Sequence, residues 1–204
     1  MPDTCSIDEA LDVLKQDLTG DKASIAAQSG IPFAILRYAP SEEFVLRRRL
    51  RLFAHDLKQN HHLNVAFASL SRFVWKAVRE TDGVDYLCKV ERDAGGVDAA
   101  QKDIEGRLIP GEPLGLAQQV IDYLDALQTA PDVVFLVRVG GIAPYIYRSS
   151  TLLHELHELG LKTPTILCYP GSSTVGTDLK FYDLPAEEGL GAYNYRVKIY
   201  GSQA

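Results

Sequence analysis

The loop that follows the apolar run Thr165 to Tyr169 carries residue types found in phosphate-binding sites. A P-loop has the pattern G-x-x-x-x-G-K-[ST] between a strand and a helix, where backbone N–H groups and a lysine hold the phosphates. Here the segment Gly171 to Thr177 supplies two glycines and ends in a threonine but has no lysine, and no helical pattern follows it. No helix N-terminus would therefore point at a phosphate. We expect no cofactor in this loop, and a degenerate nucleotide-binding domain is kept as an alternative.

Two histidines and a cysteine are the other residues that could do chemistry. His154 and His157 lie three residues apart, one residue short of the H-E-x-x-H zinc motif, and no third ligand is near in sequence. Cys168 could pair with His154 as thiol and imidazole, but it lies within an apolar run, where cysteine behaves as a small hydrophobic residue. We therefore expect no metal site and no catalytic residue, and predict that the chain is not an enzyme.

Arginine and tyrosine side chains remain, on one predicted helix and at the predicted strand ends. These residue types anchor protein interfaces. Arg47, Arg48, Arg49 and Arg51 form the most basic cluster, which is either a solvated helix face or a contact for an acidic partner or nucleic acid. At the strand ends the alternative is that Arg148 caps or braces a helix and the tyrosines line the sheet edge. The predicted partner-binding residues are Arg47, Arg48, Arg51, Arg138, Arg148, Tyr169, Tyr193 and Tyr195.

A strand–helix–strand unit must position most of these side chains. Asp132 to Val139 and Thr165 to Tyr169 are apolar runs without alternation, and Ser149 to Leu159 between them has helical spacing. Such runs are typical of parallel strands buried on both faces, joined by a right-handed crossover. Both strands should end in glycine-containing turns, the first at Gly140 and the second at Pro170-Gly171. In open α/β sheets this edge carries the functional loops.

The remaining chain predicts further strands and helices of the same layered fold. Strands are expected over Pro32 to Tyr38, Leu63 to Ala68, Leu179 to Tyr182 and Tyr193 to Tyr200, the last as an edge strand for which antiparallel pairing is one alternative. Helices are expected after Ser6, over Pro40 to Leu57, after Ser69 or Ser71, around Asp85 to Asp93 and over Leu116 to Gln128. The fold class is a three-layer α/β sandwich with a mostly parallel sheet of about five strands, degenerate P-loop-NTPase-like or flavodoxin-like.

Composition limits the function classes. The 204 residues predict a single domain over 1–204. A net charge of −6 argues against broad nucleic-acid binding but not against a local basic patch. The three cysteines lack metal-type spacing and indicate reduced thiols, so we expect a cytoplasmic protein. No signal peptide is visible, and no apolar run approaches the roughly 20 residues of a membrane span.

Several blocks of the sequence resemble the BrxB family. The N-terminal block is IPFAILRYAPSEEFVLRRRLRLFAHDL, and the stronger ones are DVVFLVRVGGIAPYIYRSSTLLHEL and TPTILCYPGSSTVGTDLKFYDL. Within them, Val139-Gly140 matches the family's V-G turn, Pro144 to Leu153 its helix start, and Tyr169-Pro170-Gly171 its strand end. Tyr193-Asn194-Tyr195-Arg196 is a permuted form of the family's usual ending, and the loop after Gly171 is longer than usual.

The resemblance implies a component of a BREX bacteriophage-exclusion system. Such a protein would work beside a PglZ-like protein of alkaline-phosphatase fold, an AAA+ ATPase and a DNA methyltransferase. No catalytic activity is implied, which agrees with the motifs above. The resemblance therefore favours an assembly or adaptor subunit, most directly contacting the PglZ-like protein, with nucleic-acid contact only within a complex as an alternative.

Overall fold

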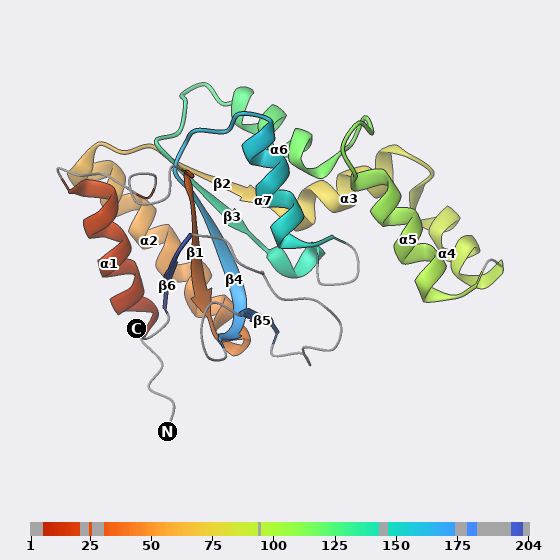
Figure 1. The fold of residues 1–204 in the computed structure, drawn as a ribbon, viewed down its shortest axis with the longest axis horizontal. Helices are drawn as coiled ribbons and strands as arrows, with labels where there is room; N and C mark the ends of the chain where they lie inside the picture. Colours follow the sequence, from red (N-terminus) through yellow and green to blue (C-terminus); the bar gives the residue numbers. More distant parts are fainter. Residues whose placement is uncertain are drawn as a thin grey trace.

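A parallel sheet forms the centre of the molecule (Figure 1). The structure is a computed structural model that describes residues 6–20, 25, 31–93, 95–142, 147–173, 179–182 and 197–201. In spatial order the parallel strands are β2 (Val65–Ser69), β3 (Val133–Val137), β4 (Thr165–Ser173), β1 (Phe33–Tyr38) and β6 (Lys198–Tyr200). β5 (Leu179–Phe181) pairs antiparallel with the end of β4.

The strands are apolar along their length because the sheet is covered on both faces. In β1, the side chains of Phe33 and Ile35 lie in one hydrophobic core, and those of Ala34 and Leu36 lie in the other. This alternation follows from the two-residue period of a strand. The sheet therefore has a hydrophobic core on each face, and the helices that cover these two cores form the two outer layers.

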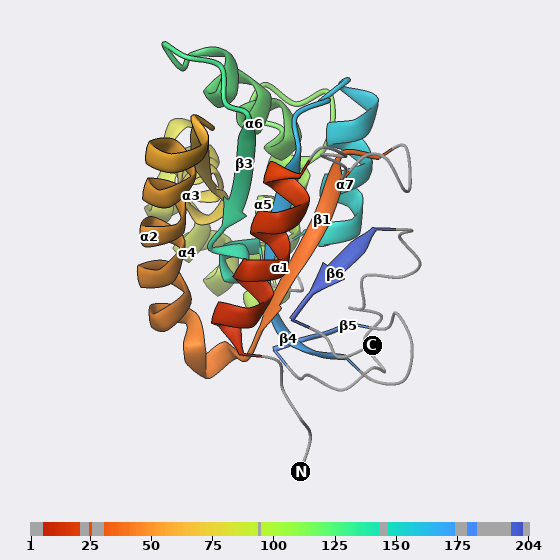
Figure 2. The ribbon, with the colours of Figure 1, turned by 90° about the vertical axis from the view of Figure 1, so that its left-hand side faces the viewer.

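Helices α1 (Ile7–Thr19) and α2 (Glu43–His61) cover one face, the second preceded by the 3-10 turn η1 (Pro40–Glu42). Figures 1 and 2 show both helices on the side of the sheet opposite α6 and α7. The predicted capping box is confirmed, since Ser6 and Glu9 bond each other's backbone N–H groups. On α2, the predicted stripe of Leu46, Leu50, Phe53 and Leu57 is buried against the sheet.

The other face is covered by α3 (Leu70–Glu80), α6 (Leu116–Asp125) and α7 (Ser149–Glu158). A 3-10 turn after β3, η2 (Val139–Ile142), packs against α3. The layers confirm the predicted three-layer α/β sandwich. The observed strand order differs from the flavodoxin order 2-1-3-4-5, and the likeness to P-loop NTPases stays a prediction.

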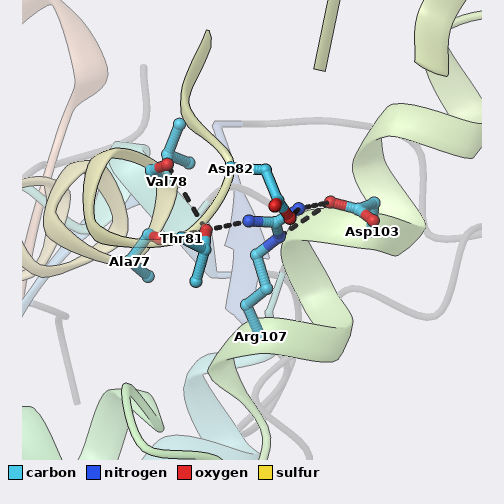
Figure 3. Close-up of polar contacts among 6 residues, drawn as sticks. All are labelled: Ala77, Val78, Thr81, Asp82, Asp103 and Arg107. Atoms are coloured by element: carbon cyan, nitrogen blue, oxygen red, sulfur yellow. Dashed lines mark hydrogen bonds and ion pairs between the residues drawn. The ribbon is translucent and has the colours of Figure 1, made fainter. Parts of the chain in front are cut away.

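A helical hairpin of α4 (Gly83–Asp93) and α5 (Val97–Leu108) extends away from the sheet beside α3 (Figure 1). Leu108 joins it to the core beneath α3, and Arg107 adds polar contacts (Figure 3). The Arg107 guanidinium donates to the Asp103 carboxylate at 2.7 Å, to Asp82 at 3.1 Å, and to the Thr81 hydroxyl. Thr81 in turn donates to the Ala77 carbonyl at 2.7 Å. One arginine thus connects α5 to the end of α3 and the turn before α4.

Two details of the predicted strands are corrected. β4 does not stop at Pro170-Gly171 but continues to Ser173. Although Pro170 has no N–H to donate, its carbonyl still accepts from the Tyr182 N–H at 2.9 Å, so pairing with β5 begins there. The edge strand β6 pairs with β1 in parallel, not antiparallel, orientation. Residues 193–196 of that predicted strand lie outside the described ranges.

Candidate functional site

The outer side of α2 carries exposed apolar and arginine side chains. Phe44 is 78% exposed and Leu52 is 56% exposed, although both are large hydrophobic residues. They lie eight residues apart with Arg48 midway, so the three share one side of the helix. Arg51 lies beside Leu52 and is also exposed. We call Phe44, Arg48, Arg51 and Leu52 the α2 outer face.

The four arginines of α2 divide into two roles. Arg47 donates to the Glu43 carboxylate at 2.7 Å, and its guanidinium lies 5.3 Å from the centre of the Phe44 ring. Arg49 forms an ion pair with Asp8 of α1 at 2.9 Å. Arg47 therefore pairs with a residue of its own helix, and Arg49 connects α2 to α1. Arg48 and Arg51 extend from the exposed side of the helix, and the Arg51 Nε donates to the Arg47 carbonyl at 3.3 Å.

Among the described residues, the predicted partner-binding arginines lie on separate elements of the fold. Arg138 is exposed at the end of β3, in a left-handed conformation with φ 58°, and lines a groove beside α3. Arg148 is exposed at the start of α7, and its side chain makes no capping hydrogen bond, so it does not brace the helix by a cap. Tyr193 and Tyr195 lie outside the described residues.

Tyr169 is corrected as a surface residue. Its side chain is 1% exposed and packs edge-to-face on Phe181, with the ring centres 5.1 Å apart. Burial raises the pKa of the Tyr169 hydroxyl. The position follows from strand alternation, since a residue inside β4 must face one of the two cores. Tyr169 therefore supports the fold and cannot touch a partner directly.

Aromatic side chains occupy the sheet edge between β1 and β4, where open α/β sheets usually bind ligands. The Tyr38 hydroxyl donates to the Glu43 carboxylate, and burial followed by this bond raises the Tyr38 pKa. Tyr182 has a left-handed backbone with φ 50°, and its hydroxyl lies over Gly140, where a β-carbon would clash with it. The V-G turn after β3 therefore packs directly against the ring of Tyr182, the residue after β5, and a larger residue at Gly140 would have to displace that ring.

The histidine and cysteine candidates lie apart from one another. His154 is exposed and lies 3.2 Å from the Glu158 carboxylate on the same helix. The His157 ring meets Phe33 edge-on at 6.4 Å. Cys168 is buried in the core beneath α1 and α2, and this burial raises the pKa of its thiol. Within the described ranges, no three His, Cys, Asp or Glu residues are grouped so as to hold a metal ion.

Sequence reasoning missed the apolar half of the α2 outer face. A cluster of charges in the sequence predicts the arginines, whereas it gives no signal for Phe44 and Leu52. Helical geometry contains the missing signal, because each residue advances about 100° around the axis. Phe44 then lies about 200° from the buried Leu46, on the far side of the helix. The described helices also include none with the length and apolar character that a membrane crossing requires.

The fold defines a three-layer α/β sandwich built on a parallel sheet. The family model described as "BREX protein BrxB" matches residues 66–199. A relative from Bacillus cereus (strain H3081.97), described as BREX protein BrxB, is 27% identical over 173 residues, which cover 81% of this chain and 85% of the relative. No solved structure matches. The chain belongs to the BrxB family, and the family prediction is confirmed; membership makes it a component of a BREX system.

Proposed function

We propose that this chain is a non-enzymatic assembly subunit that binds the PglZ-like protein of its BREX system through the α2 outer face. The proposal is supported chiefly by Phe44, a phenylalanine 78% exposed on a helix whose opposite side is fully packed. Transferring an aromatic ring from water to an interface is favourable, and apolar anchors beside arginine are typical of binding hot spots. The AAA+ ATPase and the methyltransferase of the same system are further partners in this proposal.

The α2 outer face is suited to protein rather than small-molecule binding. It is a convex helix surface, whereas small-molecule sites are concave. Arg47 stacks on the Phe44 ring and is tied to Glu43, so the anchor is held in place before a partner arrives. A side chain that is already ordered loses less entropy on binding. Arg48 and Arg51 can then bond acceptors at the rim of the contact.

The test is co-purification of the chain with the PglZ-like protein encoded in the same system. Replacing Phe44→Ser together with Leu52→Ser should weaken binding by about 30-fold or more, because truncation of a hot-spot residue costs about 2 kcal/mol or more. The melting temperature should stay close to that of the wild type, since both side chains are exposed. Affinity is measured by titration calorimetry or surface plasmon resonance.

A matched control uses two exposed apolar residues elsewhere. Val97→Ser with Ile109→Ser removes exposed apolar side chains from and beside α5, away from α2, and should leave the affinity unchanged. Full binding by the α2 variant would contradict the assignment of this surface. Absence of binding by the wild type would contradict the proposed partner. Turnover of ATP by the purified chain alone would contradict the non-enzymatic role.

A further inference from the structure

A groove of about 910 Å³ lies beside α3, on the face of the sheet opposite α2. Its walls come from α3 and α6, and Arg138 at the end of β3 closes one side. Figures 1 and 2 show α3 and α6 together on this face of the sheet. We call it the α3 groove, and the residues used below are Arg72, Trp75, Lys76, Arg79, Gln119 and Arg138.

The α3 groove is basic, although the chain as a whole carries a net charge of −6. Arg72, Lys76 and Arg79 lie four and three residues apart, so they follow one another along the exposed side of α3. At a rise of about 1.5 Å per residue, these cations span roughly 10 Å of the helix axis. Arg138 faces the same space. A row of cations of this kind matches the spaced charges of an extended polyanion better than the charge of a compact anion.

These cations are mostly available to a ligand. Among the described residues, Arg72, Arg79 and Arg138 form no ion pair with an acidic side chain. Lys76 lies 4.0 Å from Glu80, with both side chains about half exposed. An exposed pair at that distance contributes little energy, so a phosphate can replace the carboxylate as the partner of Lys76. Glu80 and Asp122, which also line the groove, are the opposing charges.

Trp75 lies among these cations and is the single tryptophan of the chain. It is 49% exposed, whereas the apolar residues on the other side of α3 are buried. The Tyr123 ring also lines the groove and is supported by Phe73, with ring centres 5.8 Å apart. Exposed aromatic rings within a basic groove provide stacking surfaces for unpaired bases.

Gln119 adds an acceptor at the floor of the α3 groove. Its Nε2 donates to the Leu114 carbonyl at 2.6 Å, which fixes the orientation of the amide. The Oε1 is buried and has no hydrogen-bond partner within the described ranges. Such an atom favours a ligand that brings a donor. Bases with amino groups supply a donor, while phosphates and carboxylates supply only acceptors.

We propose that the α3 groove binds single-stranded nucleic acid, with phosphates on the four cations and a base stacked on Trp75. An acidic peptide would also be attracted by the cations, and its backbone N–H groups could donate to the Gln119 oxygen, but its carboxylates offer no planar ring to stack on Trp75. Duplex DNA presents its bases edge-on in the grooves and offers no free base face to the ring. The site is separate from the α2 outer face, so the two surfaces can be tested independently.

The test uses the full chain and a fluorescein-labelled single-stranded oligodeoxynucleotide of about 20 nucleotides and mixed sequence. Fluorescence anisotropy gives the affinity, and Trp75 emission reports stacking because no other tryptophan contributes. We expect saturable quenching of Trp75 and an affinity that falls about 20- to 50-fold between about 50 and 200 mM salt, as three or four phosphate contacts would give. The same sequence as a duplex should quench Trp75 little.

Two sets of variants locate the site. Arg72→Glu with Arg79→Glu should lower the affinity by more than about 20-fold, whereas Arg48→Glu with Arg51→Glu on α2 changes the net charge equally and should have little effect. Trp75→Ala should lower the affinity by about tenfold, and Trp75→Phe should restore most of it. Equal losses from both arginine pairs would overturn the proposal, as would the absence of binding in low salt. Displacement of the oligonucleotide by an equal concentration of polyglutamate would show a groove for acidic peptides and would also overturn it.

Discussion

Gly141 lies so close to Ser71 that a β-carbon on the glycine would come within 2.4 Å of the Ser71 β-carbon and 2.6 Å of its α-carbon. The turn η2 can pack on the start of α3 only because this side chain is missing. Gly141→Ala should therefore cost about 2–3 kcal/mol, since the backbone of one element must move. Urea denaturation measures the loss.

Gly106 is the matched control for that substitution. It lies inside α5, and a β-carbon there would meet nothing within 4 Å. Gly106→Ala should stabilise the protein by about 0.5–1 kcal/mol, because alanine is the better helix former. If both substitutions changed the stability by the same small amount, the close contact between η2 and α3 would not exist in solution.

The C-terminal strand is attached to the N-terminal helix through Asp17. The Tyr200 hydroxyl and the Lys198 ammonium of β6 donate to the Asp17 carboxylate at 2.6 and 2.5 Å. Burial alone would raise the pKa of Asp17, but these hydrogen bonds together lower it below its usual 3.8. The stabilisation is therefore present above about pH 4 and is lost as the pH falls through the lowered value.

Replacing Tyr200→Phe removes one of these bonds and should cost about 1–2 kcal/mol at neutral pH, because the acceptor is charged. The cost should shrink in acid as Asp17 becomes protonated. Tyr86→Phe on α4 retains the ring that lies 5.4 Å from Arg107 and should leave the stability unchanged. Chemical denaturation at several pH values measures both variants, and a pH-independent loss for Tyr200→Phe would argue against the role of Asp17.

Arg107→Lys should loosen the α4–α5 hairpin. A lysine keeps the charge but cannot reach Asp103, Asp82 and Thr81 at once, because it lacks the forked guanidinium (Figure 3). The expected cost is about 1.5–3 kcal/mol, with faster amide exchange over residues 83–108. Arg92→Lys, on the exposed side of α4, is the control and should change neither quantity.

The layered fold could be predicted from sequence because apolar runs and helical spacing report burial directly. The unit from β3 through α7 to β4 is the clearest case, since each of its elements was located within a few residues. Strand order could not be predicted in the same way, because pairing depends on contacts between distant segments. The path of β4 past Pro170 is a further example, since it depends on the Tyr182 N–H.

The candidate surfaces were only partly predictable for a related reason. Residue type predicted arginine contacts, but exposure decides which arginines are available, and Arg47 and Arg49 are used within the fold. The α3 groove brings Arg138, just after β3, together with Arg72 of α3, and 66 positions separate them in sequence. A pattern along the chain cannot reveal that two such distant residues lie close together in the fold.

Glu155 gives a last prediction, because this acidic residue is only 6% exposed. The Tyr147 hydroxyl donates to one carboxyl oxygen, and the other, Oε2, has no hydrogen-bond partner within the described residues. Burial raises the pKa of Glu155 above its usual 4.5. The folded state therefore holds the proton more tightly than the unfolded state, and the stability falls as the pH rises from about 4.5 through the raised value.

Replacing Glu155→Gln removes the charge while leaving an oxygen to accept from Tyr147. The variant should gain stability relative to the wild type as the pH rises from acid to neutral, and the two should converge in acid, where Glu155 is protonated. Glu158→Gln, on the exposed end of the same helix, is the control and should show a much weaker dependence. The opposite result would be a wild type that gains stability over Glu155→Gln on going to neutral pH. In that case the fold would stabilise the carboxylate, and the interpretation that its second oxygen is buried without a partner would be wrong.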